Sequence, residues 1–187
     1  GNTIALWHFD EGSGQTAADA AGFNHGQLGS TAGADANDPT WVQAGPTWVD
    51  GKFGKALYFD GVYTGNPLGG DYVRVPSPSS LYITDEITVD MWIKPTGLPD
   101  RWYGDAVRLG LGYELCLRGD GRLEIALRRS SSWSWWDSIS AIPIPATDFY
   151  HVSFTYDSDG GANNLKIYIN GVPVSYTHLT LPTKRIV

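Results

Sequence analysis

The stretch YELCLRGDGRLEIAL, residues 113–127, contains two alternating apolar segments separated by a Gly-Asp-Gly loop. Residues that face each other in an antiparallel pair lie on the same side of the sheet. A three-residue loop, Gly119 to Gly121, sets apolar residues opposite apolar residues, whereas a two-residue loop would set Leu117 opposite Glu124. The predicted pairs are Leu117 with Leu123, Leu115 with Ile125 and Tyr113 with Leu127. The stretch therefore predicts a β-hairpin, with Gly121 as the left-handed residue of its loop.

A second hairpin is predicted in NLKIYINGVPVSY, residues 164–176, because Asn170-Gly171 is typical of a two-residue type I′ turn. Pro173 then lies opposite Tyr168 at a non-hydrogen-bonded position, so we expect an edge or a bulge on its outer side. The predicted apolar pairs are Ile169 with Val172, Ile167 with Val174 and Leu165 with Tyr176.

The rest of the chain also indicates strands rather than helices. Apolar residues occupy every second position in ITVDMWIKP, residues 87–95, and in YHVSFTYD, residues 150–157, as in strands with one buried face. Further strands are expected at 4–9, 55–60 and 72–75, and no long apolar segment keeps a helical period. Residues 22–54 are predicted to form a long ordered excursion, held in place by Trp41 and Trp48. These patterns predict an all-β, antiparallel fold.

Composition limits the class of protein. The chain has 187 residues, enough for one domain with a full core, and 23 glycines and 11 prolines fit many turns. A net charge of -7 disfavours nucleic acid as a partner. No apolar run is long enough to insert in a membrane, and the single cysteine, Cys116, excludes an internal disulfide.

The order of several segments resembles the laminin-G-like family of concanavalin A-like lectin/glucanase domains. They are LWHFDEGSGQTAADAAG (6–22), GKFGKALYFDGV (51–62), DYVRVPSPSSLYITDEITVDMWIKP (71–95) and the strands described above, so the resemblance covers residues 3–174. It implies a jelly-roll sandwich of two antiparallel sheets, usually an accessory module tethered to other domains of a secreted or cell-surface protein. Many members bind glycans, many hold a structural calcium ion, and others mediate adhesion between proteins.

The end of the chain departs from this resemblance. The family continues beyond the second hairpin with further strands, whereas residues 175–187 read SYTHLTLPTKRIV. We therefore expect one domain over residues 1–174, truncated before its last strands, and a non-native tail over 175–187 that resembles translated sequencing-adapter read-through. The alternative is a genuine divergent strand, because Tyr176 fits the hairpin register.

Exposed aromatic residues are the main candidates for ligand binding. The segment RRSSSWSWWDS, residues 128–138, places three tryptophans among small polar residues, and DRWYGD, residues 100–105, adds two aromatic residues. Indole rings stack on the apolar faces of sugars, and a nearby arginine can bond hydroxyl or carboxylate groups. The predicted ligand residues are Trp102, Tyr103, Arg128, Trp133, Trp135 and Trp136. Alternatively, these rings cap the end of the sandwich or cover a sheet edge.

Acidic residues in turns are candidates for a structural Ca²⁺, which prefers carboxylate and carbonyl oxygens in irregular loops. Asp10 opens a glycine-rich loop, and a strand-loop-strand excursion would bring Asp60 near Asp71. The resemblance makes calcium plausible at Asp10, Asp60 and Asp71. The alternative is ordinary turn chemistry, because aspartate is favoured in turns.

Catalysis is not predicted. The Glu-x-Asp-x-Glu pattern of retaining glucanases is absent, since Glu86 and Asp90 have Thr88 between them, although Glu114 and Glu124 could share a face as diagonal neighbours. The sequence thus favours a non-catalytic carbohydrate-binding domain outside the cell or on its surface. An adhesion or spacer domain is the first alternative, and a glycoside hydrolase or polysaccharide lyase is the second.

Overall fold

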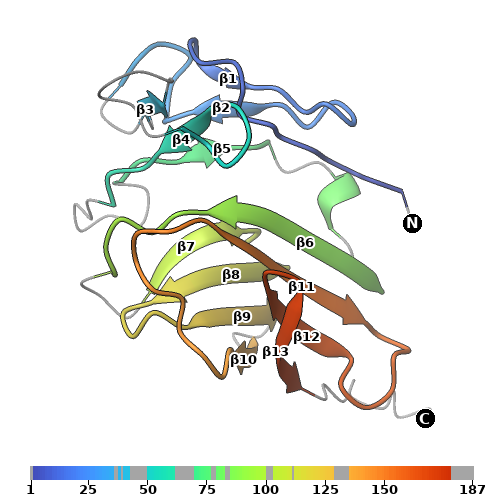
Figure 1. Ribbon diagram of the computed structural model, residues 1–187. Helices are drawn as coiled ribbons and strands as arrows, with labels where there is room; N and C mark the ends of the chain where they lie inside the picture. Colours follow the sequence, from blue (N-terminus) through green and yellow to red (C-terminus); the bar gives the residue numbers. More distant parts are fainter. Residues whose placement is uncertain are drawn as a thin grey trace. The chain divides into compact units, whose positions relative to one another are not determined.

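The computed structural model describes residues 2–35, 38, 40–42, 50–61, 70–76, 79–82, 85–99, 103–110, 112–128 and 135–177, with backbone only at 40–42, 103, 128 and 135–137. The chain divides into two compact units, Gly1–Leu81 and Tyr82–Val187. Apart from the 3-10 turn η1 (Ser79–Leu81), the regular elements of the described residues are strands, and all of their pairings are antiparallel. The predicted all-β sandwich is confirmed (Figure 1).

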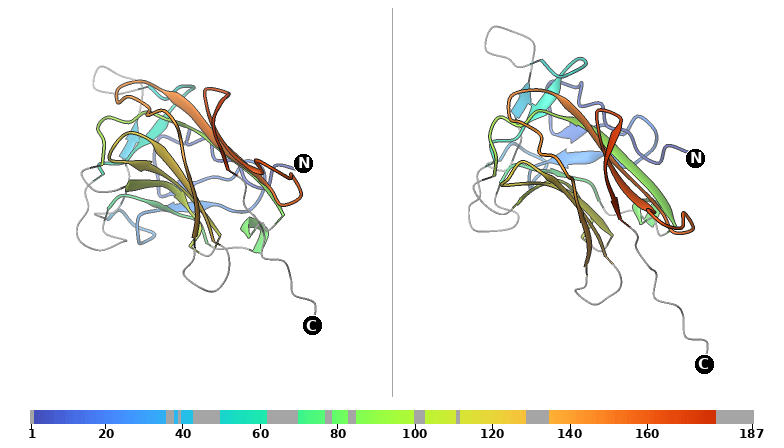
Figure 2. Two further views of the ribbon diagram at one scale, coloured as in Figure 1. Left: turned by 90° about the horizontal axis from the view of Figure 1, so that it is seen from below. Right: turned by 60° about the horizontal axis from the view of Figure 1, so that its bottom comes forward.

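The second unit contains two four-stranded sheets (Figure 2). The first has the order β10–β9–β8–β7, formed by β7 (Tyr103–Arg108), β8 (Tyr113–Arg118), β9 (Leu123–Arg128) and β10 (Trp135–Ile139). The second has the order β13–β12–β11–β6, formed by β6 (Glu86–Ile93), β11 (Tyr150–Asp157), β12 (Leu165–Ile169) and β13 (Val172–Thr177).

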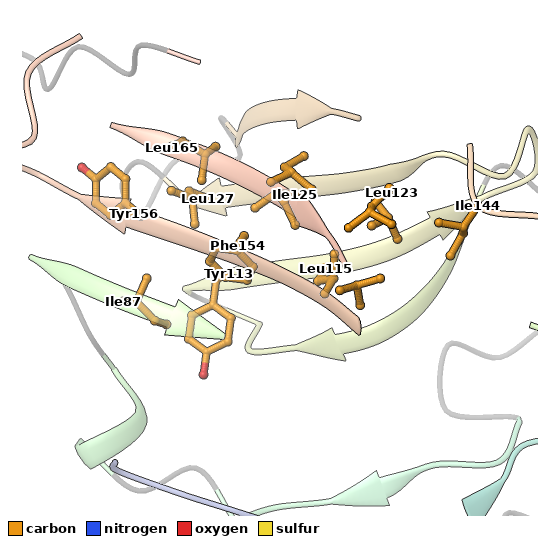
Figure 3. Close-up of a cluster of buried hydrophobic side chains, with 13 residues drawn as sticks. Ile87, Tyr113, Leu115, Leu123, Ile125, Leu127, Ile144, Phe154, Tyr156 and Leu165 are labelled. Atoms are coloured by element: carbon orange, nitrogen blue, oxygen red, sulfur yellow. The ribbon is translucent and has the colours of Figure 1, made fainter. Parts of the chain in front are cut away.

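The core of this unit lies between the two sheets. Leu115, Leu123 and Ile125 from one sheet and Phe154 and Ile167 from the other are fully buried in one cluster (Figure 3). Because side chains alternate along a strand, the residues between these core positions lie on the opposite face of each sheet. Each sheet therefore presents a second, outer face with a different composition.

The hairpin of β8 and β9 has the predicted register. Leu117 pairs with Leu123, and the two other predicted pairs are also present. Gly121 has a φ of 81°, and a Cβ there would lie 3.2 Å from the carbonyl oxygen of Ile144. Glycine is thus required both by the left-handed backbone and by the close approach of the chain.

The hairpin of β12 and β13 follows the prediction only near its turn. Asn170 and Gly171 have positive φ, Ile169 pairs with Val172, and Tyr168 pairs with Pro173. Beyond Pro173 a bulge shifts the register, so that Ile167 pairs with Ser175 and Leu165 with Thr177. The predicted pairs Ile167 with Val174 and Leu165 with Tyr176 are therefore wrong.

Contacts with the neighbouring sheet explain this bulge. The Ser175 hydroxyl lies 3.0 Å from that of Ser138, and the Thr177 hydroxyl donates to Ser138 Oγ at 2.7 Å. The carbonyl oxygen of Val174 accepts from the backbone N–H of Ala141 at 3.1 Å. The shift places two hydroxyls against the buried Ser138. Ser175 to Thr177, the first residues of the predicted tail, are thus part of β13.

The first unit has smaller sheets. β1 (Thr16–Ala17), β2 (Gly26–Leu28) and β5 (Val73–Arg74) form one, and β3 (Thr40–Val42) and β4 (Ala56–Tyr58) form the other. Ala17 and Leu28 are buried at its centre. The predicted strands at 55–60 and 72–75 correspond to β4 and β5. Within the predicted excursion 22–54 lie β2 and β3, while Trp48 and the side chain of Trp41 fall outside the described residues.

The strand predicted at 4–9 is wrong, because this segment makes a single bridge, Trp7 with Asp19. Its hydrogen bonds go largely to other groups. The Leu6 N–H donates to the Asp19 carboxylate at 2.8 Å, and the Trp7 indole donates to the carbonyl oxygen of Asn24 at 2.9 Å. The Asp19 carboxylate thereby accepts a backbone hydrogen bond that the carbonyl group of a neighbouring strand would otherwise accept.

Candidate ligand-binding face

The outer face of the sheet β10–β9–β8–β7 carries a concentrated set of charged side chains. Leu115 and Leu117 of β8 face the core, so Glu114, Cys116 and Arg118 lie on the other side. The same holds for Glu124 of β9. A bulge between Asp105 and Val107 in β7 brings both Asp105 and Arg108 to this side. We call this set the charged face: Asp105, Arg108, Glu114, Cys116, Arg118 and Glu124.

Ion pairs connect the strands of the charged face. Arg118 pairs with Glu124 across the hairpin, and its Nε lies 3.6 Å from Asp120. Arg108 reaches Glu114 at 3.5 Å and Asp105 at 3.3 Å. The Arg118 Nε is buried and has no hydrogen-bond acceptor among the described residues. Each arginine is thus held between carboxylates, with a donor left over on Arg118.

Glu114 is the most perturbed acid of the charged face. It is 8% exposed, and burial raises the pKa of its carboxyl to about 7, reinforced by the Asp105 carboxylate and opposed by Arg108. Burial also raises the pKa of the Cys116 thiol, so this group stays protonated, and Sγ lies 3.7 Å from the carbonyl oxygen of Glu124. A buried carboxyl with a strongly shifted pKa is typical of functional sites.

Ligand atoms of Asp105, Glu114 and Cys116 lie within 4.8 Å of one another. Such a group could in principle hold a metal ion. However, the single positive charge of Arg108 already pairs with both carboxylates, the raised pKa of Glu114 favours its neutral form, and Cys116 is a protonated thiol beside them. This arrangement suits hydrogen bonding to a polar ligand better than binding of a cation.

The predicted aromatic ligand residues fall largely outside the described residues. Trp102 and Trp133 lie there entirely, as do the side chains of Tyr103, Arg128, Trp135 and Trp136. The backbone register nevertheless shows which residue is opposite each of these positions. Tyr103 pairs with Arg118, Trp135 with Arg128 and Trp136 with Leu127. Position 136 is therefore opposite the core residue Leu127. Positions 103 and 135 are opposite Arg118 and Arg128, which directly follow Leu117 and Leu127 in their strands.

Sequence reasoning considered Glu114 and Glu124 only as a catalytic pair and overlooked the arginines between the acids. The signal was present in the charged residues that alternate with the leucines of β8. Asp105 and Arg108 had no comparable signal, because the bulge in β7 determines that they share a face.

The predicted calcium residues all lie in the first unit. The Asp60 N–H donates to Asp71 Oδ2 at 2.9 Å, so these two residues are brought together as expected. Asp10 Oδ1 instead accepts the N–H of Lys55 at 2.9 Å. Burial raises the pKa of Asp71, and the carboxylates of Asp60 and Asp38 raise it further.

Asp38, which the sequence did not single out, adds a third acid to this pair. Its Oδ2 accepts the N–H of Asp35 at 3.1 Å, while its Oδ1 is buried without a hydrogen-bond donor among the described residues. A buried carboxylate oxygen without a donor is costly unless a cation compensates it. Asp38, Asp60 and Asp71 offer the carboxylate oxygens that calcium prefers, although their ligand atoms do not form a group within 4.8 Å of one another, as those of Asp105, Glu114 and Cys116 do.

The two antiparallel sheets of the second unit place the chain in the class of all-β sandwich domains. The chain belongs to the concanavalin A-like lectin/glucanases superfamily, whose sequence model matches residues 64–185. The resemblance seen in the sequence is thereby confirmed. No curated protein sequence matches the chain.

Two solved structures are similar to the chain. Domain 4 of AbnA, a GH43 extracellular arabinanase from Geobacillus stearothermophilus solved in complex with arabinotriose, has a TM-score of 0.64 and 22% identity, covering 96% of this chain and 77% of that one. An S-layer domain-containing protein from Clostridium thermocellum has a TM-score of 0.48 and 22% identity, covering 97% and 76%. The first likeness supports the fold. No helix in the described part of the chain is long and apolar enough to span a membrane.

Proposed function

We propose that the chain is a non-catalytic carbohydrate-binding domain of a larger extracellular or cell-surface protein, and that its ligand binds to the charged face. The observation that carries this proposal is the alternation of Arg108 and Arg118 with three carboxylates on one side of a sheet. A protein does not need such a partly buried charged array for stability, because apolar residues of similar volume would stabilise as well.

The geometry suits recognition of hydroxyl groups. An arginine held by carboxylates presents its remaining N–H groups in a fixed direction, and the carboxylates accept from neighbouring hydroxyls. Glu114 is 8% exposed and contributes by holding Arg108 in place through their ion pair. Few, well-oriented polar groups are what gives a binding site its specificity.

The register adds aromatic positions to this array. On the edge strand β7, position 103 pairs with position 118, and on the edge strand β10, position 135 pairs with position 128. We therefore retain Tyr103 and Trp135, together with Arg128, as ligand residues at the two margins of the charged face.

A glycoside hydrolase is the second candidate, because a carboxyl with a raised pKa lies beside a second carboxylate, as an acid and a nucleophile would. We favour binding because Arg108 contacts both Asp105 and Glu114. Release of reducing sugar from any polysaccharide, abolished by Glu114→Gln, would reverse this preference.

We also propose a structural Ca²⁺ in the first unit, held by Asp38, Asp60 and Asp71. Its support is the buried oxygen of Asp38 and the raised pKa of Asp71, to which burial and the carboxylates of Asp60 and Asp38 contribute. The ion would neutralise the acids and hold together the loops that carry them. Asp10 is a weaker candidate, because its Oδ1 accepts the N–H of Lys55.

Native affinity gels test the main proposal. The full chain would be run through arabinan, xylan, mixed-linkage glucan and galactomannan with calcium present. We expect retardation by at least one polysaccharide. Arg118→Met, which keeps the length of the side chain, should weaken binding about tenfold or more, since hydrogen bonds to charged groups contribute about 1.5–3 kcal/mol.

The matched control is Arg74→Met, which removes an exposed arginine from β5 in the first unit and should bind normally. Melting curves show whether each variant is folded. Absence of retardation by every polysaccharide would contradict the proposal and favour the adhesion alternative. Unchanged binding by a folded Arg118→Met variant would exclude the charged face as the site.

A further inference from the structure

The sheet β13–β12–β11–β6 has an outer face of its own. Met91 of β6 packs against the core and Val152 of β11 is buried in it, so Trp92 and His151 lie on the other side, where they are directly opposite each other. Trp92 is 41% exposed. Trp92 is the penultimate residue of β6, so its exposed indole lies near the end of the strand.

Neighbouring groups restrict the orientation of this pair. The Trp92 and His151 rings lie 5.3 Å apart with an interplanar angle of 52°, and His151 Nε2 is 3.3 Å from Asp90 Oδ1. The His151 N–H donates to Asn170 Oδ1 at 2.9 Å, and the Asn170 N–H donates back to the His151 carbonyl at 2.7 Å. The indole is thus one end of an ordered row of groups on adjacent strands.

A second row crosses the same face two residues away along β6. Asp90 is opposite Ser153, and Ser153 is opposite Tyr168. Adjacent strands are about 4.8 Å apart, so this row extends about 10 Å from a carboxylate to a phenol ring. We call these residues the aromatic face: Asp90, Trp92, His151, Ser153 and Tyr168. Together they provide three aromatic rings, a carboxylate and two hydroxyl groups on one face of the sheet.

We propose that the aromatic face is a second glycan-binding site, which takes a neutral oligosaccharide stacked on Trp92 and hydrogen-bonded to Asp90. This inference rests on the proposed function. Asp90 and Lys166, which alternates with the core residues Leu165 and Ile167, give this face charges of both signs, so it favours neither an anionic nor a cationic glycan over a neutral one. The carboxylate of Asp90 and the hydroxyl of Ser153 beside the aromatic rings suit the hydroxyl groups of a sugar, which is why we commit to a glycan, although tryptophan and tyrosine are also enriched in protein interfaces.

A domain with a glycan-binding site on each outer face can bind two polysaccharide segments. The two sheets face each other through a shared core, so their outer faces point in opposite directions. A single polysaccharide segment cannot lie on both faces at once. One domain can therefore hold two polysaccharide segments, which is enough to cross-link polysaccharide chains.

The test measures binding and cross-linking separately, with a soluble polysaccharide that retards the wild-type chain. We expect the wild-type chain to bind and to produce turbidity. Trp92→Ala should weaken binding at the aromatic face about tenfold, a loss typical of one stacking contact. It should remain bound through the charged face but produce no turbidity. The control is Phe23→Ala, which removes a 96% exposed ring from the first unit and should behave as the wild-type chain.

Each outcome separates the two proposals. Turbidity retained by a folded Trp92→Ala variant would overturn the second site and leave the proposed function intact. If Arg118→Met binds normally but Trp92→Ala does not, the aromatic face stands and the charged face is wrong. If the wild-type chain binds no polysaccharide, both proposals fall.

Discussion

Replacing Glu114 with glutamine should change how the stability of the domain depends on pH. Burial, with help from Asp105 and against Arg108, raises the pKa of Glu114 from 4.5 to about 7. Between these values the folded chain holds a proton that the unfolded chain releases. The resulting stabilisation is fully present below pH 4.5 and is lost as the pH rises to about 7.

The size of the effect follows from this pKa difference. Each pKa unit corresponds to about 1.4 kcal/mol, so the upper limit is about 3 kcal/mol. Partial solvation of the carboxylate reduces it, and we expect the free energy of unfolding of the wild-type chain to fall by about 1–3 kcal/mol relative to that of Glu114→Gln between about pH 5 and about pH 8. In a chain of this length each kcal/mol shifts Tm by about 2–4 °C.

Melting curves of the wild-type chain and Glu114→Gln across this pH range measure the difference directly. Glu86→Gln is the control, because Glu86 is exposed at the start of β6 and its replacement should leave the profile parallel to that of the wild-type chain. The reasoning is refuted if Glu114→Gln and the wild-type chain lose stability in parallel, or if the variant becomes the less stable of the two as the pH rises.

Three further predictions concern other parts of the chain. Asp19 is buried, which opposes its ionisation, but N–H groups of Leu6, Asn24 and Ala21 donate to it and lower its pKa to about 2. Its stabilisation is present above pH 3.8 and lost as the pH falls through about 2, so Asp19→Asn should lower stability by about 2 kcal/mol at neutral pH in denaturant titrations. Trp136→Ala should lower Tm and Trp135→Ala should lower affinity in the gels, because only position 136 is opposite a core residue; equal effects in both assays would contradict the register argument. Calcium should raise Tm relative to chelator, and Asp71→Asn should abolish the difference; identical melting in calcium and chelator would remove the metal.

Much of the sandwich could be predicted from the sequence, because strand alternation and hairpin register depend on residues close together in the chain. The pairs of β8 and β9 and the Asn170-Gly171 turn were recognised in this way. The bulge after Pro173 was expected only as one of two possibilities. Its actual position depends on Ser138, which lies 37 residues before Ser175 and has no local signal near the turn.

The candidate sites were less predictable, because each combines side chains from distant strands. Local patterns in the sequence determined which residues of a strand face the core and therefore which residues face away from it. Only the tertiary structure decided which outward residues meet, because pairing of β6 with β11 joins Trp92 to His151, and the β7 bulge sets Arg108 opposite Glu114. Alternation depends on backbone geometry, which every strand has by itself, whereas a site depends on strand order, which the burial of the whole core determines.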